Sequence, residues 1–133
     1  MNRVVWTSSL ESLGLIEPLM EEMQELYSVL PPLELRLLLS EAITNAIQHA
    51  NRLQEQKKVT IEWCRGEVAP WTIDEQFRQN TWIFSVQDEG DGFEMEEVPV
   101  PCELPGGRGV FILKSLTKFV CYRSEERRLI FII

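Results

Sequence analysis

Residues 41–49 read Glu41-Ala-Ile-Thr-Asn45-Ala-Ile-Gln-His49, and they set three polar side chains four residues apart within an apolar stretch. On an α-helix this spacing places Glu41, Asn45 and His49 on nearly the same face. A carboxylate and a carboxamide on one face can serve the same metal–phosphate assembly, because Mg²⁺ takes oxygen ligands and keeps few of them from protein. The segment therefore predicts a helix that lines a polar site.

Two glycine-containing patches follow along the chain. The first is Asp88-Glu-Gly90-Asp-Gly92-Phe93, which closes an apolar run and opens a turn. The second is Gly106-Gly107-Arg108-Gly109-Val110, which runs into another apolar stretch. Each patch alone is weak, but the order acid-x3-Asn, Asp-x-Gly-x-Gly and Gly-rich turn is typical of a nucleotide pocket. The sequence has no GxxxxGK[ST] segment, which excludes an ordinary P-loop.

The residue types predict separate roles at such a pocket. Glu41 is the candidate base for an attacking hydroxyl or water, and Asn45 is a candidate neutral ligand for Mg²⁺. Asp88 can accept a hydrogen bond from the exocyclic amine of adenine, whereas guanine presents a carbonyl at the equivalent ring position. The backbone amides of residues 106–110 can form an anion-binding nest at the start of a helix, with added charge from Arg108.

Each of these residues also has an ordinary structural interpretation. Glu41 alone suits a solvated helix position, Asn45 a hydrogen bond between elements, and Asp88 an Asp-Gly turn. A flexible Gly-rich loop with a solvated Arg108 would explain the third patch. His49 is the only histidine, and a packed or capping role is more usual for such a residue than ligation. The functional interpretation depends on the three patches occurring together.

Composition and charge indicate one ordinary domain and favour some classes of binding partner over others. Of the 133 residues, 44% are hydrophobic and 26% are charged, so a single core over residues 1–133 is expected. The net charge of −8 disfavours nucleic acid and anionic membrane surfaces and favours a protein partner. The three cysteines are widely separated, which favours free thiols. Without the ~20-residue apolar run of a membrane-spanning helix, we expect a cytoplasmic protein.

Hydrophobic periodicity predicts two or three helices on one face of a sheet. The expected helices are 10–30, with Pro18 as a kink or the true start, 32–55 and 110–118; the expected strands are 3–7 at an edge, 57–63, 82–87, 119–122 and 129–133. Residues 64–81 form a long excursion whose role is not evident. The predicted fold class is α+β, a two-layer sandwich with a mixed, mostly antiparallel sheet.

At these residues the chain resembles the ATP-binding domain shared by gyrase, heat-shock chaperone, histidine kinase and mismatch-repair ATPases, the Bergerat fold. Glu41 to Asn45 resembles its N box, 88–93 its first glycine box and 107–109 its second. Within that superfamily the chain looks most like the small bacterial anti-sigma-factor serine/threonine kinases, in which Ser-Glu-Ala-Ile-Thr-Asn-Ala-Ile-Gln-His-Ala is a typical phrase. Two segments depart from that family, namely the longer 64–81 connection and a final strand without the usual Gly-Thr entry.

The resemblance implies an ATP- and Mg²⁺-dependent protein serine/threonine kinase. It would make Glu41 the catalytic base, Asn45 the Mg²⁺ ligand and Asp88 the adenine-reading acid. The residues implied to bind nucleotide are Asn45, Asp88, Gly90, Gly92, Phe93, Gly106, Gly107, Arg108, Gly109 and Val110. It also implies a homodimer that binds a sigma factor and phosphorylates an anti-sigma-factor antagonist.

Two other functions stay open from the residues alone. A non-catalytic, partner-switching module would hold ATP through Asp88 and the glycines, because only phosphoryl transfer needs Glu41. A simple ATPase subunit of a larger machine would need further domains on another chain. Where the terminal phosphate of ATP goes, to a protein, to water or nowhere, distinguishes the three functions.

Overall fold

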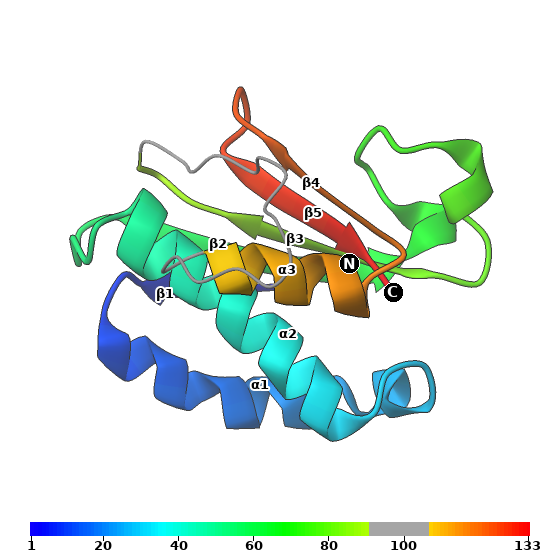
Figure 1. The fold of residues 1–133 in the computed structure, drawn as a ribbon, viewed down its shortest axis with the longest axis horizontal. Coiled ribbons are helices and arrows are strands. Elements are labelled where there is room, and N and C mark those ends of the chain that lie inside the picture. Colours follow the sequence, from blue (N-terminus) through cyan, green and yellow to red (C-terminus); the bar gives the residue numbers. More distant parts are fainter. Residues whose placement is uncertain (91–106) are drawn as a thin grey trace.

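An antiparallel sheet and a layer of helices on one of its faces make up the structure (Figure 1). The computed structural model describes residues 1–90 and 107–133, with the backbone alone for 107–110. The described strands are β1 (Asn2–Thr7), β2 (Lys58–Arg65), β3 (Trp82–Gln87), β4 (Phe119–Arg123) and β5 (Arg128–Ile132), in the spatial order β1-β2-β3-β5-β4. Every pairing between them is antiparallel, and the expected two-layer α+β architecture is confirmed.

The first helical region is divided where one amphipathic helix was expected. It consists of a 3-10 helix (Leu10–Leu15), α1 (Ile16–Glu22) and a second 3-10 helix (Gln24–Ser28). Ser9 caps the first of these, since its hydroxyl accepts a hydrogen bond from the backbone N–H of Glu11. Pro18 lies in the first turn of α1, where its missing N–H costs no hydrogen bond. Of the two predicted roles for Pro18, the structure therefore supports the start of the α-helix.

The second helix changes its hydrogen bonding part of the way along. It runs as α2 (Pro32–Thr44) and continues as a π-helix over Asn45–Ala50, short of the expected end near Glu55. Arg52 and Leu53 then adopt positive φ angles, which turn the chain away from the helix axis. Helix α3 (Gly107–Leu116) packs beside α2 and begins before the expected 110.

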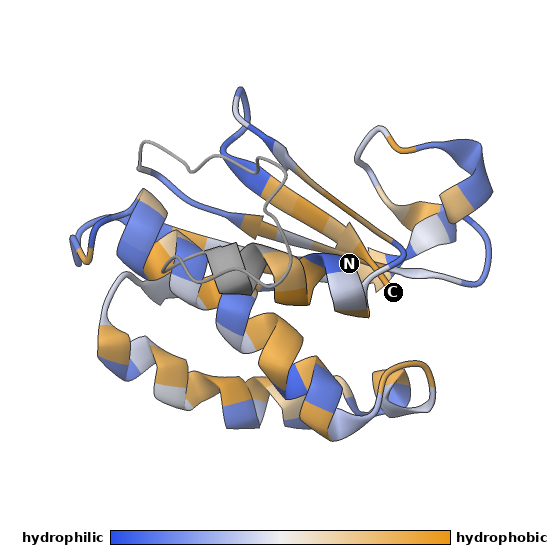
Figure 2. Ribbon diagram, viewed as in Figure 1, coloured by the Kyte–Doolittle hydropathy of each residue, from blue (hydrophilic) through white to orange (hydrophobic). Residues whose placement is uncertain are grey.

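Both faces of the sheet are covered, but by different parts of the chain. The helices pack on the apolar side chains of one face, and Figure 2 shows that the central strands of the sheet are largely apolar. That core includes Leu35, Leu38, Leu39, Ile43, Ile61, Trp63, Phe84, Val86, Leu129 and Phe131. The 64–81 excursion packs on the other face through Trp71, Ala69, Ile73 and Phe77. None of the helices in the described ranges is long and apolar enough to cross a membrane.

Candidate functional site

Asp88 lies at the end of β3 on the helix-covered face of the sheet. Side chains alternate along a strand, and the helix-facing residues of β3 are Trp82, Phe84 and Val86. Asp88 continues this set one step beyond the strand and is 3% exposed. The Asp88 carboxylate accepts two hydrogen bonds, from the Gly90 backbone N–H to Oδ1 at 3.0 Å and from the Tyr122 hydroxyl to Oδ2 at 2.7 Å. The predicted turn acid is therefore a buried and oriented carboxylate.

Burial raises the pKa of Asp88 above its ordinary value, because the charged form loses hydration. The hydrogen bonds from Tyr122 and Gly90, and the positive charge of Arg127, partly oppose this rise in the Asp88 pKa. The same contact acts on the phenol, since burial and the neighbouring carboxylate raise the pKa of Tyr122. The Asp88–Tyr122 pair is thus held with the proton on the tyrosine.

Gly90 fixes the turn after Asp88 against the end of the π-helix. A Cβ atom at Gly90 would lie 1.8 Å from the backbone oxygen of Ala50 and 2.9 Å from the backbone nitrogen of Asn51. Backbone atoms at such distances cannot move aside independently, so only glycine fits at this position. The close approach joins the segment 88–90 directly to the helix that carries Glu41 and Asn45.

Asn51 is a buried residue that connects this region, and sequence reasoning did not select it. Its Oδ1 accepts a hydrogen bond from the Glu89 backbone N–H at 2.9 Å. Its Nδ2 donates to the hydroxyl of Ser8 at 2.7 Å and to the backbone oxygen of Lys58 at 3.1 Å. Asn51 is 0% exposed, so these hydrogen bonds satisfy an amide that would otherwise be costly to bury. One side chain therefore joins the helix end to segments beside β1, β2 and β3.

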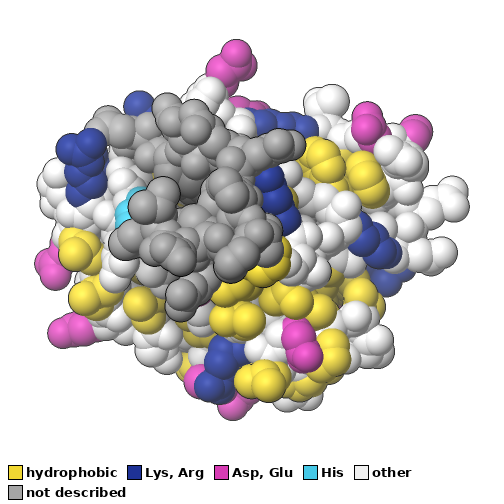
Figure 3. All heavy atoms as spheres, in the orientation of Figure 1, with side chains coloured by type: hydrophobic (Ala, Val, Ile, Leu, Met, Phe, Trp, Pro, Cys, Tyr) yellow, Lys and Arg dark blue, Asp and Glu magenta, His cyan; other side chains and the backbone are white. Residues whose placement is uncertain are grey.

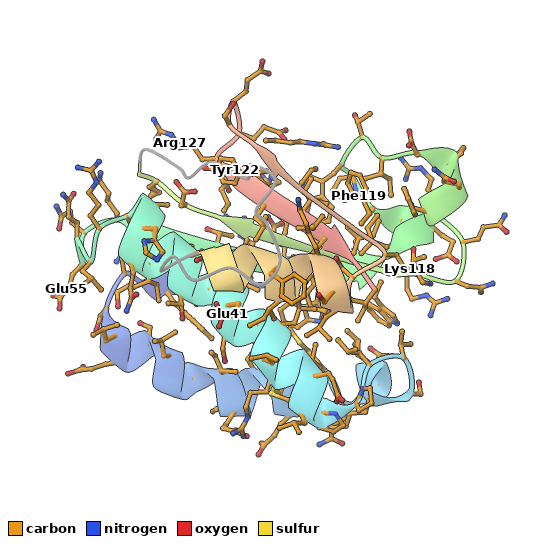
Figure 4. The ribbon with its side chains drawn as sticks, in the orientation of Figure 1. Glu41, Glu55, Lys118, Phe119, Tyr122 and Arg127 are labelled. Carbon is orange, nitrogen blue, oxygen red and sulfur yellow. The ribbon has the colours of Figure 1, made fainter. Side chains whose placement is uncertain are left out.

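Glu41 and Asn45 lie one helical turn apart on α2 and at the start of the π-helix. Glu41 is half-buried, and Figure 4 shows it on α2 near the beginning of α3. Asn45 is 5% exposed, and its Nδ2 has no hydrogen-bond partner among the described residues. A buried amide without a partner is rare in folded proteins and calls for a ligand, an ion or water. The pair is thus a carboxylate at the edge of a site and an amide inside it.

His49 does not share the environment of Glu41 and Asn45. The four-residue spacing predicted one common face, but residues 45–50 form a π-helix, which has more residues per turn than an α-helix. His49 is exposed, and its side chain is visible at the surface in Figure 3. Short π-helical segments are frequent at functional sites, and here the segment begins at Asn45.

The third predicted patch is described only in part. Residues 107–110 form the first turn of α3, which fits the expectation that a Gly-rich segment opens a helix. The backbone of Gly107, Arg108, Gly109 and Val110 is thereby placed beside α2. The remaining predicted residues, Gly92, Phe93 and Gly106, lie outside the described residues, as does the stretch rich in Glu and Pro between them.

The described residues fit a magnesium ion that is held by few protein ligands. They contain no cluster of three or more His, Cys, Asp or Glu side chains able to enclose a metal. The unpaired, buried amide of Asn45 offers one site, and rotation of the amide by half a turn would present its oxygen there. Mg²⁺ commonly binds through one or two protein oxygens together with phosphate oxygens and water. Asn45 is the residue that would hold the ion.

Tyr122 is the other site residue that the sequence did not predict. It was assigned to a strand only, and the contact with Asp88 spans 34 positions in the sequence. The available signal was a tyrosine in a short strand, since a buried tyrosine usually needs a partner for its hydroxyl. Asn51 had a comparable signal as an amide two residues after the 41–49 motif, although the expected helix 32–55 included it.

The comparison with known protein families agrees with this geometry. The family described as "Histidine kinase-like ATPase domain" matches residues 3–133 of the chain. No curated protein matches the chain. The five-stranded antiparallel sheet with helices on one face is consistent with the Bergerat fold of that family. Because the match covers nearly the whole chain, the protein belongs to the family of histidine kinase-like ATPase domains, which bind ATP and typically Mg²⁺ with it.

Proposed function

We propose that the chain is an ATP- and Mg²⁺-dependent protein serine/threonine kinase that acts as an anti-sigma factor. Its substrate would be an anti-sigma-factor antagonist, and it would also sequester a sigma factor and form a homodimer. The partner assignments rest on the resemblance of residues 40–50 to anti-sigma-factor kinases. The observation that carries the kinase activity is the half-buried carboxylate of Glu41, one turn before the buried and unpaired amide of Asn45.

The chemistry would consist mainly of positioning and charge neutralisation. Asp88 would orient adenine by accepting from its amino group, and the amides at the start of α3 would face the phosphates. The acceptor hydroxyl oxygen forms a bond to the terminal phosphorus while the bond from that phosphorus to the β–γ bridging oxygen breaks. The hydroxyl proton passes to Glu41, and ADP leaves. Mg²⁺, when bound at Asn45, would supply the positive charge that neutralises the phosphate oxygens.

A label-transfer experiment tests the proposal. The purified chain is incubated with Mg²⁺, terminally labelled ATP and small antagonist-class proteins from the same organism, and label is measured in protein serine or threonine and in free phosphate. We expect label on an antagonist hydroxyl. Label only in free phosphate would instead favour an ATPase. No turnover with intact ATP binding would favour the non-catalytic, partner-switching module.

Glu41→Gln is the variant that tests the base, and Glu34→Gln is its matched control. Both glutamates are half-buried residues of α2. Loss of a general base typically costs about 10²- to 10⁴-fold in rate, so we expect the Glu41 variant to lose transfer and to keep ATP binding. The Glu34 variant should keep both properties. Loss of ATP affinity with unchanged turnover of the bound nucleotide would contradict the role of Glu41.

A further inference from the structure

Tyr122 reaches Asp88 because of the register of three neighbouring strands. In β4 it pairs with Leu129 of β5, and Leu129 pairs with Val86 of β3. These residues form a row on the helix-covered face, and Asp88 lies two positions beyond Val86 along the chain. The tyrosine is long enough to span the diagonal, and its hydroxyl donates to Asp88 Oδ2 at 2.7 Å. Figure 4 labels Tyr122 near Arg127, which lies in the turn between β4 and β5.

Among the described residues, the hydrogen bonds at Asp88 leave acceptor capacity for a ligand on both oxygens. Each carboxylate oxygen can accept about two hydrogen bonds. Gly90 occupies one position on Oδ1 and Tyr122 one position on Oδ2. Within the part of the chain that the structure describes, these donors fix the plane of the carboxylate while acceptor capacity remains. A ligand amine can use that capacity without displacing either donor.

Several charged and polar groups surround Asp88. Among the described residues, Tyr122 is the main side chain that donates a hydrogen bond to the Asp88 carboxylate. Arg127, from the turn between β4 and β5, contributes positive charge, but its guanidinium donates to the backbone oxygen of Glu89 at 3.3 Å. The Glu89 carboxylate accepts a hydrogen bond from the backbone N–H of Lys58. The end of the π-helix contributes the neutral amide of Asn51, which binds the Glu89 N–H.

We propose that Tyr122 is a positioning residue for adenine recognition, which holds Asp88 ionised and turned toward the ligand amine. The inference rests on the proposed role of Asp88 as the acid that reads adenine. Tyr122 acts through Asp88 and needs no contact with the nucleotide for this role. A buried carboxylate that loses one of its donors takes up a proton more readily, and a protonated carboxyl has less capacity to accept from an amine.

The test is the pH dependence of ATP affinity in Tyr122→Phe, measured by calorimetry from mildly acidic to neutral pH. Dividing the affinity of the variant by that of the unmodified protein removes the titration of the ATP phosphates. A hydrogen bond to a charged group corresponds to roughly one to two pKa units. We therefore expect the acidic loss of affinity to begin roughly one pH unit or more higher in the variant. A constant ratio across the pH range would overturn the inference.

Tyr27→Phe is the matched control. Tyr27 is the only other tyrosine, and its partly buried hydroxyl donates to the backbone oxygen of Met20 at 3.1 Å within the helical layer. Removing it deletes a comparable hydrogen bond without touching Asp88, so the affinity ratio should stay constant with pH. If Tyr27→Phe shifts the profile as much as Tyr122→Phe does, the shift reflects general loosening and the inference is wrong.

A second measurement serves if Tyr122→Phe does not fold. Fluorotyrosine is incorporated in the Tyr27→Phe background, so that residue 122 alone carries it. The fluorinated phenol is more acidic and donates a stronger hydrogen bond, which should move the acidic loss of affinity to lower pH. The opposite shift, or none, would contradict the role of Tyr122.

Asp88→Asn separates a failure of this inference from a failure of the proposed function. If Asp88 reads adenine, the substitution weakens ATP more than it weakens purine riboside triphosphate, which lacks the amino group. If both nucleotides weaken equally, the role of Asp88 fails and the role of Tyr122 fails with it. If Asp88→Asn discriminates but Tyr122→Phe leaves the pH profile unchanged, only the inference about Tyr122 is overturned.

Discussion

The burial of Asp88 suits ligand recognition but lowers the stability of the fold. Its carboxylate is nearly fully buried, and desolvation raises its pKa although two hydrogen bonds and Arg127 oppose the rise. A buried ionised group costs free energy of folding unless its partners compensate for the lost hydration. Here the compensation is incomplete, which is acceptable if the remaining acceptor capacity is used by a ligand. Functional residues are commonly placed at such an energetic cost.

Asp88→Asn should gain stability relative to the unmodified protein as pH rises toward neutral, because burial raises the pKa of Asp88. The native pKa lies above the unfolded one, so the aspartate favours the folded state fully only below the unfolded pKa. That contribution is lost as pH rises through the native pKa, which leaves a penalty at neutral pH. The advantage of the variant should therefore shrink as pH falls toward the ordinary range for aspartate.

Urea denaturation of the two proteins at several pH values measures this difference directly. Asp74→Asn, the same substitution at an exposed position of the excursion, is measured in parallel as the control. A stability difference that stays constant with pH, or that changes in the opposite direction, would contradict the raised pKa of Asp88.

At the level of elements, the strands could be predicted closely from the sequence, whereas the helix boundaries could not. The alternating burial of β2 is a local property. The alternation of apolar and polar residues from Val59 to Trp63 therefore predicted the strand directly. The end of the second helix depends on the side chain of Asn51, whose partners Ser8 and Glu89 are distant in sequence. The π-helical continuation of α2 changes the backbone hydrogen bonding but does not interrupt the apolar pattern, so the sequence pattern did not predict it.

The site was predictable where its residues are close in sequence, and less so where strands bring them together. Glu41 and Asn45 share one helix, and Asp88 and Gly90 share one turn, so spacing alone could select them. Tyr122 meets Asp88 through the pairing order β3-β5-β4, in which β5 follows β4 in the chain but lies between it and β3. No local pattern in the sequence reports that order.

The 64–81 excursion acts as a separate element that covers the face of the sheet away from the helices. Arg78 holds it together by donating to the backbone oxygens of Gly66, Ala69 and Trp71 at 3.5, 3.3 and 3.4 Å. The apolar side chains of the excursion pack on Ile83, Ile130 and Ile132. The excursion is therefore expected to contribute to stability and to leave the nucleotide site unaffected.

Arg78→Ala should lower the free energy of unfolding by about 2 kcal/mol, because three backbone acceptors lose the guanidinium and, within the described residues, only Gly66 keeps another donor, the Ala69 N–H. The affinity for ATP should stay unchanged, since Asp88 and α2 lie on the other face of the sheet. Arg65→Ala is the control: Arg65 is exposed and pairs with Glu67 at 3.6 Å, and its loss should cost less than about 1 kcal/mol. Chemical denaturation and calorimetry measure the two properties, and a fall in ATP affinity would show that the excursion communicates with the site.

For the whole molecule, ATP should stabilise the fold because its site joins elements from most of the chain. The segment 88–90 contacts the end of the π-helix, β4 and the turn before β5, so a ligand there bridges distant parts of the sequence. Binding to the native state alone at 100 times the dissociation constant adds about 2.7 kcal/mol, and for a chain of this size that corresponds to roughly 10 °C in Tm. GTP at the same concentration should give a much smaller shift, because it lacks the amino group that Asp88 would accept from.

Thermal unfolding with ATP should also respond to removal of the metal. A chelator should reduce the ATP-dependent shift in the unmodified protein, because the charge of the phosphates is then no longer neutralised at Asn45. In Asn45→Ala the ATP-dependent rise in Tm should be small even with Mg²⁺ present, and the chelator should reduce that rise little further. The substitution removes an amide whose Nδ2 has no partner among the described residues, so it should disturb stability without ATP only slightly. If the Asn45→Ala variant keeps the full Mg²⁺-dependent shift in Tm, the ion is held by other groups. If GTP shifts the Tm of the unmodified protein as much as ATP does, the site does not recognise adenine.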